Sequence, residues 1–167
     1  MGRFSYLREG VNVALLMGAG DMIAQFFIEK KEFSAWNISR TARFSAVGLI
    51  VVGPSLRKWY STMDRLVSKE QTAIKRGFKK MLLDQCLFAP PFTLLLTYLI
   101  PFVNGEKHEN IVRHVRQNYF TILKNSFLLW PLAQTINFIV VPSQYQVIYV
   151  QIVALIWNCY LSGALNS

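Results

Sequence analysis

Charged residues are missing from two long stretches of this chain. The 43 residues at positions 125–167 contain no Asp, Glu, Lys or Arg, and neither do the 21 residues at positions 85–105. Charged side chains make up about a quarter of an ordinary soluble domain, so gaps of this length favour lipid as the solvent. A segment in lipid must satisfy its own backbone hydrogen bonds, which a helix does and an open strand does not. The missing charge therefore predicts an all-α integral membrane helical bundle.

Five segments are candidates for membrane helices, at positions 10–28, 41–56, 81–103, 125–141 and 146–164. The fourth is short and contains Pro131, so it either crosses the membrane or is re-entrant or buried within the bundle. We predict four membrane helices, or five if this segment spans, in a single domain of residues 1–167. The basic stretch that follows the second segment and the polar residues 107–116 are predicted to be interfacial amphipathic segments.

Proline and glycine predict interruptions of these helices. Gly53 and Pro54 follow each other near the end of the second segment, Pro90 and Pro91 lie near the middle of the third, and Pro131 lies in the fourth. Proline has no amide N–H and its ring clashes with the preceding helical turn. We therefore expect these positions to break or kink the helices.

The first segment combines small and polar residues. Its two pairs of small residues with small-xxx-small spacing predict the close approach of a second helix, at positions Ala14, Gly18, Gly20 and Ala24. Asp21 and Gln25 are four residues apart, so they share one helix face.

Polar residues at membrane depth are the main functional signal: Asp21, Gln25, Asp84, Gln85, Gln134, Asn137, Gln151 and Asn158. Such groups are costly in lipid unless they are paired or face water. One interpretation is that they lock the bundle through interhelical hydrogen bonds and an ion pair between Lys80 and Asp84. The other is that they line a polar pathway for solutes, with the two carboxyl groups as the sharpest candidates. The residues alone leave both open.

Catalytic and cofactor patterns are absent from the sequence. His108 and His114 are six residues apart, outside the spacing of a zinc protease motif, and no nucleophile or phosphate-loop pattern is present. Cys86 and Cys159 lie in apolar stretches and define no disulfide framework. The net charge of +9 is explained by basic flanks that face anionic lipid headgroups, rather than by nucleic acid. We expect no enzyme activity, no cofactor, no metal and no direct nucleic-acid binding.

Six motifs nevertheless resemble one family in sequence and in order. They are GAGDMIAQ at 18–25, SRTARF at 39–44, GPSLRKWY at 53–60, KKMLLDQCLFAP at 79–90, LWPLAQTINFIVVP at 129–142 and IWNCYLS at 156–162. On these motifs the chain resembles the Mpv-seventeen and twenty-two-kilodalton peroxisomal membrane protein family.

This resemblance implies a small four-span protein of the mitochondrial inner membrane or the peroxisomal membrane. It implies a channel for small solutes or metabolites, and links to organelle DNA maintenance and control of reactive oxygen species. The KKMLLDQ motif with the flanking residues 88–90 favours the mitochondrion. The leading hypothesis is a non-selective channel with Asp21, Gln25, Asp84 and Gln85 nearest the pathway. The alternative is a non-conducting membrane scaffold or assembly factor. Membrane lipid and small solutes are the expected partners, and a homo-oligomer is left open.

Overall fold

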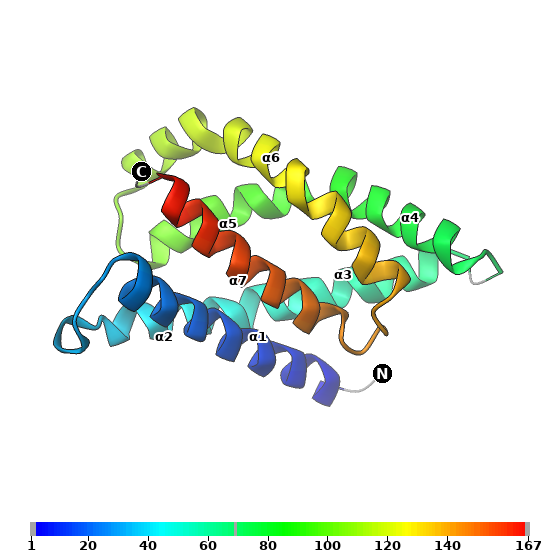
Figure 1. The fold of residues 1–167 in the computed structure, drawn as a ribbon, viewed down its shortest axis with the longest axis horizontal. Coiled ribbons are helices and arrows are strands. Elements are labelled where there is room, and N and C mark those ends of the chain that lie inside the picture. Colours follow the sequence, from blue (N-terminus) through cyan, green and yellow to red (C-terminus); the bar gives the residue numbers. More distant parts are fainter. Residues whose placement is uncertain (1–2, 69, 166–167) are drawn as a thin grey trace. The chain divides into compact units, whose positions relative to one another are not determined.

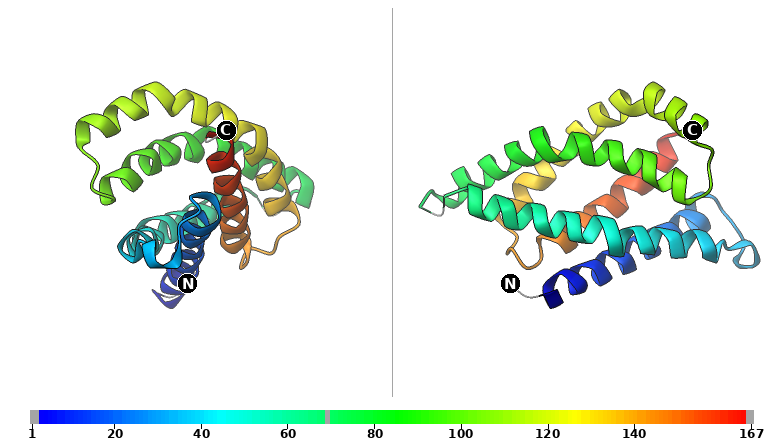
Figure 2. Two further views of the ribbon diagram at one scale, coloured as in Figure 1. Left: turned by 60° about the vertical axis from the view of Figure 1, so that its left-hand side comes forward. Right: turned by 180° about the vertical axis from the view of Figure 1, so that it is seen from behind.

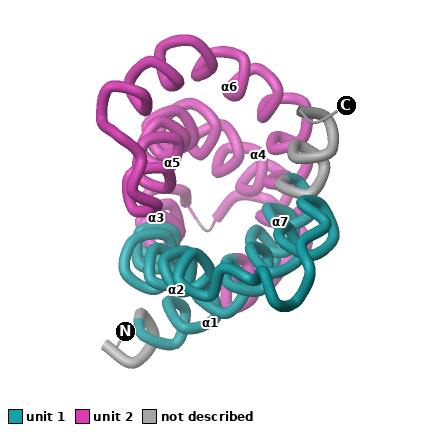
Figure 3. Tube along the Cα trace, turned by 90° about the vertical axis from the view of Figure 1, so that its left-hand side faces the viewer, with its two compact units in different colours: residues 1–58, 147–167 teal, residues 59–146 magenta. Residues whose placement is uncertain are grey.

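All regular structure that the computed structural model describes is helical (Figure 1). The described residues are 3–68 and 70–165, with side chains for residues 7–68 and 70–157. No strand occurs among them, which confirms the all-α class. The chain divides into two compact units, residues 1–58 with 147–167 (unit 1) and residues 59–146 (unit 2), coloured separately in Figure 3. The expectation of a single domain stays a prediction.

Unit 1 is built on a pair of helices packed side by side. The first is α1 (Arg3–Ile23), which runs on into the π-helical turn η1 (Ala24–Ile28). The second is α2 (Ile38–Val47), which continues through the π-helical turn η3 (Gly48–Val52) into α3 (Gly53–Leu66). Helix α1 contacts both α2 and η3 along its length. The short 3-10 turn η2 joins the two helices, and the C-terminal helix α7 completes the unit.

Glycine and alanine bring the two helices of this pair together. A Cβ built on Gly53 would lie 2.7 Å from the Cα of Gly10, and one on Gly48 would lie 3.0 Å from the Cα of Ala14. Separations this short leave no room for larger side chains, so the backbones are in direct contact. The predicted close approach of a second helix is confirmed at Ala14 and at Gly18, which faces Ser45 of α2, whereas Gly20 faces Leu155 of α7.

Unit 2 is a long helical hairpin together with the second half of α3. Its first arm is α4 (Ala73–Leu83), the π-helical turn η4 (Asp84–Phe88) and α5 (Ala89–Val103), which follow one another without a gap. Its second arm is the 32-residue α6 (His108–Ile139), which runs back along both α5 and α4 (Figure 2).

The prolines do not break the helices as expected. Gly53 has helical dihedral angles and donates its N–H to the Gly48 carbonyl, five residues back, in the turn just before Pro54. Ala89 makes the same five-residue bond to Asp84 just before Pro90 and Pro91. A π-helical turn shifts the preceding carbonyls out of α-helical register, which relieves the clash that a proline ring causes. A break at these positions is therefore wrong, because these turns accommodate the prolines, whereas a kink at Gly53, Pro54, Pro90, Pro91 and Pro131 stays a prediction.

The C-terminal half of the chain also differs from its predicted division. The predicted interfacial segment at 107–116 and the predicted helix at 125–141 are joined in one continuous helix, α6, which runs from His108 to Ile139 through Pro131. The interfacial position of residues 107–116 stays a prediction. The expected turn at residues 142–144 is present, where Tyr145 donates its N–H to the Pro142 carbonyl at 2.8 Å. Helix α7 (Gln146–Leu165) then starts at the predicted residue.

Two helices among the described residues are long and apolar enough to cross a membrane, Leu7–Ile28 and Ala73–Val103, and Gln146–Trp157 is a shorter apolar helix. Large apolar side chains lie on the surface, with Leu128 at 80% exposed, whereas acids, amides and a lysine are buried. An apolar exterior around a partly polar interior is expected of helices in lipid, where polar groups face the protein.

Candidate functional site

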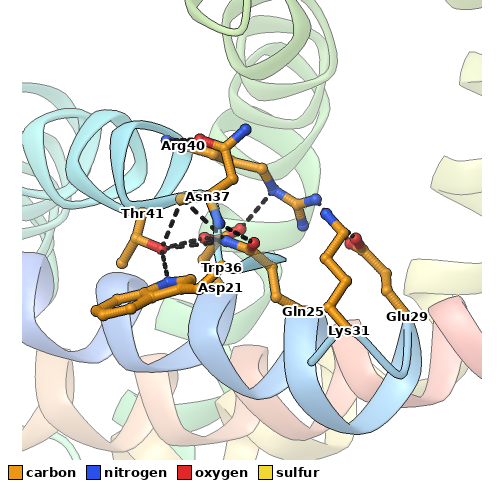
Figure 4. Close-up of polar contacts among 8 residues, drawn as sticks. All are labelled: Asp21, Gln25, Glu29, Lys31, Trp36, Asn37, Arg40 and Thr41. Atoms are coloured by element: carbon orange, nitrogen blue, oxygen red, sulfur yellow. Dashed lines mark hydrogen bonds and ion pairs between the residues drawn. The ribbon is translucent and has the colours of Figure 1, made fainter. Parts of the chain in front are cut away.

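The predicted polar residues gather in two separate clusters, one in each unit. The cluster in unit 1, here the Asp21 cluster, consists of side chains from the end of α1, from η1 and from the start of α2: Asp21, Gln25, Trp36, Asn37, Arg40 and Thr41 (Figure 4). Asn37 is the N-cap of α2 and accepts a hydrogen bond from the Arg40 amide at 2.9 Å. This cap fixes the first turn of α2 against α1.

Asp21 is saturated with hydrogen bonds, although only 3% of it is exposed. Its Oδ1 accepts from Arg40 Nε at 2.7 Å. Its Oδ2 accepts from Gln25 Nε2 and from the Thr41 hydroxyl, each at 2.7 Å. The guanidinium supplies a compensating positive charge, so the buried carboxylate is both paired and fully bonded.

The other members of the Asp21 cluster are satisfied in turn. Gln25 Oε1 accepts from the Asn37 amide at 2.8 Å, and its Nε2 also reaches the Asn37 carbonyl at 3.2 Å. Trp36 Nε1 donates to the Thr41 hydroxyl at 3.1 Å. The predicted pairing of Asp21 and Gln25 on one helix face is confirmed, and the cluster ties α1 to the start of α2.

The Asp21 cluster reaches the surface through Arg40. Its Nη1 lies 2.7 Å from Glu29 Oε1, and Lys31 pairs with the same carboxylate at 2.8 Å. Burial raises the pKa of Glu29, but the hydrogen bonds from Lys31 and Arg40 and their positive charges outweigh it, so the pKa is lowered from its ordinary value.

The Asp84 cluster lies in unit 2 and joins three helical segments. Its members come in pairs from α3, η4 and α6: Trp59 and Tyr60, Asp84 and Gln85, and Gln134 and Asn137. Asp84 Oδ1 accepts from Trp59 Nε1 at 2.8 Å. Its Oδ2 accepts from Gln134 Nε2 at 2.8 Å and from Gln85 Nε2 at 2.9 Å. Thus three neutral donors hold a carboxyl group that is only 2% exposed.

The hydrogen bonds of the Asp84 cluster are incomplete. Asn137 Nδ2 donates to Gln134 Oε1 at 2.9 Å, and Gln134 Nε2 also reaches the Tyr60 hydroxyl at 3.2 Å. However, Gln85 Oε1 and Asn137 Oδ1 are buried acceptors that have no hydrogen-bond partner in the described part of the chain. An unmade hydrogen bond at a buried acceptor is costly, so these two oxygens are sites where a donor would be stabilised.

The expected ion pair between Lys80 and Asp84 does not form. Lys80 Nζ instead pairs with Asp64 of α3 and lies 5.8 Å from the centre of the Phe138 ring. A lysine four residues before an acid is the less favourable order on a helix, and the Asp84 oxygens already have three donors. Lys80 therefore connects α4 to α3 and leaves the carboxyl group of η4 to neutral partners.

Of the two other predicted polar residues, Gln151 belongs to neither cluster and is buried in α7. Asn158 lies outside the residues whose side chains the structure describes.

Several residues that the sequence analysis did not single out complete the clusters. Trp36 and Trp59 donate their Nε1 hydrogens into the two clusters. Arg40, Thr41, Trp59 and Tyr60 all lie within the motifs SRTARF and GPSLRKWY, which was the available signal for their roles. Glu9 was missed without any such signal. It is 1% exposed, and its Oε2 has no hydrogen-bond partner within the described residues.

The arrangement of these groups is suited to hydrogen bonding and binding. No group of three or more His, Cys, Asp or Glu side chains that could hold a metal ion occurs among the residues described. Cys86 is a free, exposed thiol. Both clusters consist of carboxyl, amide, indole and hydroxyl groups, which are hydrogen-bonding groups rather than a nucleophile with its base.

Comparison with known proteins gives consistent results along the chain. The model of the Mpv17 / PMP22 family matches residues 102–162. The mitochondrial inner membrane protein Mpv17 of Drosophila melanogaster is 49% identical over 163 residues, which cover 98% of this chain and 97% of that protein. The protein of the same name from Xenopus laevis is 35% identical over 99% of this chain and 93% of its own length. Protein sym-1 of Neurospora crassa is 30% identical over 93% of this chain and 89% of its own length.

No solved structure matches the chain significantly. The names of the relatives support the mitochondrial inner membrane, which the sequence analysis favoured over the peroxisomal membrane. A relative that is 49% identical over nearly the whole of both chains is sufficient to assign the family. The chain belongs to the Mpv17 / PMP22 family of membrane proteins.

Proposed function

We propose that this chain is a multi-pass channel of the mitochondrial inner membrane that conducts small solutes or metabolites. It crosses the membrane with four helices, or with five if residues 125–141 span fully. The Asp84 cluster forms part of its polar lining, with Asp84 and Gln85 nearest the pathway. The channel needs no cofactor, catalyses no reaction and does not bind nucleic acid.

The observation that carries this proposal is the incomplete pairing of the Asp84 cluster. Asp84 lies in the long apolar helix Ala73–Val103, where an ionisable group is expensive to keep. Its three donors Trp59, Gln85 and Gln134 are all neutral. The oxygens Gln85 Oε1 and Asn137 Oδ1 have no partner in the described part of the chain. A cluster that only held helices together would favour complete hydrogen bonding. Unused acceptors beside a carboxyl group are suited to a passing solute or water.

The local backbone also supports movement at this position. Asp84 and Gln85 belong to the π-helical turn η4, which lies directly before Pro90 and Pro91. π-Helical turns are frequent at functional sites, and they mark places where a helix bends. Bending at η4 would move the carboxyl group relative to α3 and α6, and so couple opening to the cluster. The turn η3 before Pro54 offers unit 1 a similar hinge.

The alternative function, a non-conducting scaffold or assembly factor, is favoured by the Asp21 cluster. There the carboxylate, the glutamine and the threonine are all bonded, and Arg40 balances the charge. Asp21 and Gln25 are therefore proposed to fix the fold, with a place near the pathway as their second role. Links to organelle DNA maintenance and to reactive oxygen species would follow from solute flow in the first case and from assembly in the second.

Single-channel recording in planar bilayers tests the choice between these functions. Purified wild-type chain should give discrete current steps, and Asp84→Asn should change their size or ion selectivity because it removes a negative charge from the pathway. Glu106→Gln removes the same charge from an exposed position and is the matched control. Silence from wild-type protein with verified helicity and incorporation would favour the scaffold.

A further inference from the structure

A cavity lies between α4 and α6 at the start of the hairpin in unit 2. Its volume is about 600 Å³, and it is open to the surface. The residues that line it and that matter below are Ile74, Lys75, Phe78, Lys79 and Ile139. It lies apart from the Asp84 cluster, since none of these residues belongs to that cluster.

The cavity lies beside a close contact between α4 and α6. Gly77 faces the end of α6, and a Cβ at this position would collide with Ile139. Ile74 is 68% exposed and Phe78 is 51% exposed, so together with Ile139 they present an apolar surface that no described side chain covers fully.

Positive charge borders this apolar surface along one side. Lys75 and Lys79 are four residues apart on α4 and lie next to Ile74 and Phe78 in sequence. Neither lysine forms a salt bridge in the part of the chain that the structure describes, and no acidic side chain lines the cavity there. The N-terminus of α4, which is capped by Thr72, adds a partial positive charge at the same end.

The lining of the cavity sets two requirements for its occupant. Lys75 and Lys79 favour an anionic group, and Ile74, Phe78 and Ile139 favour an apolar body. The complementary molecule is therefore an amphiphile with a negatively charged headgroup.

We propose that this cavity binds an anionic glycerophospholipid such as phosphatidylglycerol. Lys75 and Lys79 bind the phosphodiester, and an acyl chain lies over Ile74, Phe78 and Ile139. The placement suits a lipid, because α4 opens the apolar helix Ala73–Val103 and its first turns therefore lie where headgroups meet hydrocarbon. Basic pockets between membrane helices commonly hold anionic headgroups.

Native mass spectrometry of the purified chain in detergent tests this proposal with defined lipids. Dioleoyl phosphatidylglycerol should bind at least tenfold more tightly than dioleoyl phosphatidylcholine. The water-soluble headgroup glycerophosphoglycerol should not bind at the same concentrations, since it lacks the acyl chains. Equal binding of the two lipids, or equal binding of the soluble headgroup, would overturn the proposal. These comparisons use wild-type protein, so they decide the question even if a variant does not fold.

Variants then assign the residues. Lys75→Gln with Lys79→Gln should weaken phosphatidylglycerol binding about twenty-five-fold, since each lysine near an anionic headgroup contributes roughly a factor of five. Lys107→Gln with Lys124→Gln makes the same change in net charge at exposed positions outside the cavity and should leave binding unchanged. Equal losses in the two double variants would show a general charge effect and contradict a site.

Discussion

The Asp21 cluster and the Asp84 cluster both bury a carboxyl group, but they stabilise it by different means. Asp21 is held by a guanidinium as well as by an amide and a hydroxyl, and its neighbours are fully bonded. Asp84 is held by an indole and two amides, and two oxygens of its cluster have no partner among the described residues. The first arrangement resembles a structural ion pair and the second a polar site with unused capacity.

This difference suggests that the Asp21 cluster serves mainly stability and the Asp84 cluster mainly function. Breaking a charge-balanced pair leaves an uncompensated buried charge, whereas neutralising a carboxyl group that has only neutral donors does not. Mutations in the Asp21 cluster should therefore affect folding most, and mutations in the Asp84 cluster should affect conduction more than folding. The following predictions test that contrast from the largest effect to the smallest.

Arg40→Ala should have the largest effect, a loss of about 3 kcal/mol in the free energy of unfolding, because it leaves Asp21 charged and buried. Reversible unfolding in mixed micelles, followed by circular dichroism, measures it. The double variant Arg40→Ala with Asp21→Asn should recover part of the loss. If the double variant is as unstable as the sum of the two single variants, the pair carries no coupling.

Replacing a tryptophan by phenylalanine makes one matched change in both clusters. Trp59→Phe removes a donor to a carboxyl group and should cost about 1.5 kcal/mol, while the ring can still stack on Phe88, 5.1 Å away between centres. Trp36→Phe removes a donor to the Thr41 hydroxyl and should cost only about 0.7 kcal/mol. Chemical denaturation of both variants gives the comparison. A larger cost at Trp36 would reverse the expected order.

Asp84→Asn should cost about 1 kcal/mol of stability, since an amide keeps one acceptor for Trp59 but presents an N–H₂ group to the donors Gln85 and Gln134. The unfolding midpoint should shift little in the experiment that shows a large shift for Arg40→Ala. A loss as large as that of Arg40→Ala would mean that both clusters are structural, and any change in conductance would then be secondary.

The ion pairs of Glu29 should give the smallest effect, about a few tenths of a kcal/mol, as is usual for exposed pairs. Because the pKa of folded Glu29 is lowered, its contribution is present above the ordinary value of 4.5 and disappears as the pH falls through the folded pKa. Thermal unfolding of wild type and Glu29→Gln should differ at pH 7 and converge in acid. A constant difference between pH 7 and pH 3.5 would exclude this titration.

Local features of the fold were predictable because helical geometry relates only nearby residues. The hydrogen bond between Asp21 and Gln25 follows from their spacing of four residues, and the start of α7 follows from the turn after Pro142. The sequence analysis missed that α6 is continuous, because its side chains change from polar to apolar along the helix while the backbone stays helical. A break at the prolines was the wrong half of that prediction, because a π-helical turn that accommodates a proline has no clear sequence signature.

The sequence alone determined that this chain is helical and resides in a lipid bilayer. Long stretches without charged residues can be recognised from composition, without knowledge of tertiary contacts. It also named most of the polar residues that matter. Only the tertiary structure decided which of them meet. Gln134 donates a hydrogen bond to Asp84, which is 50 residues earlier in the sequence, and Lys80 pairs with Asp64 rather than with Asp84. Both contacts depend on where α3, α4 and α6 cross. Helix crossings are set by packing over many residues, and no single spacing in the sequence encodes them.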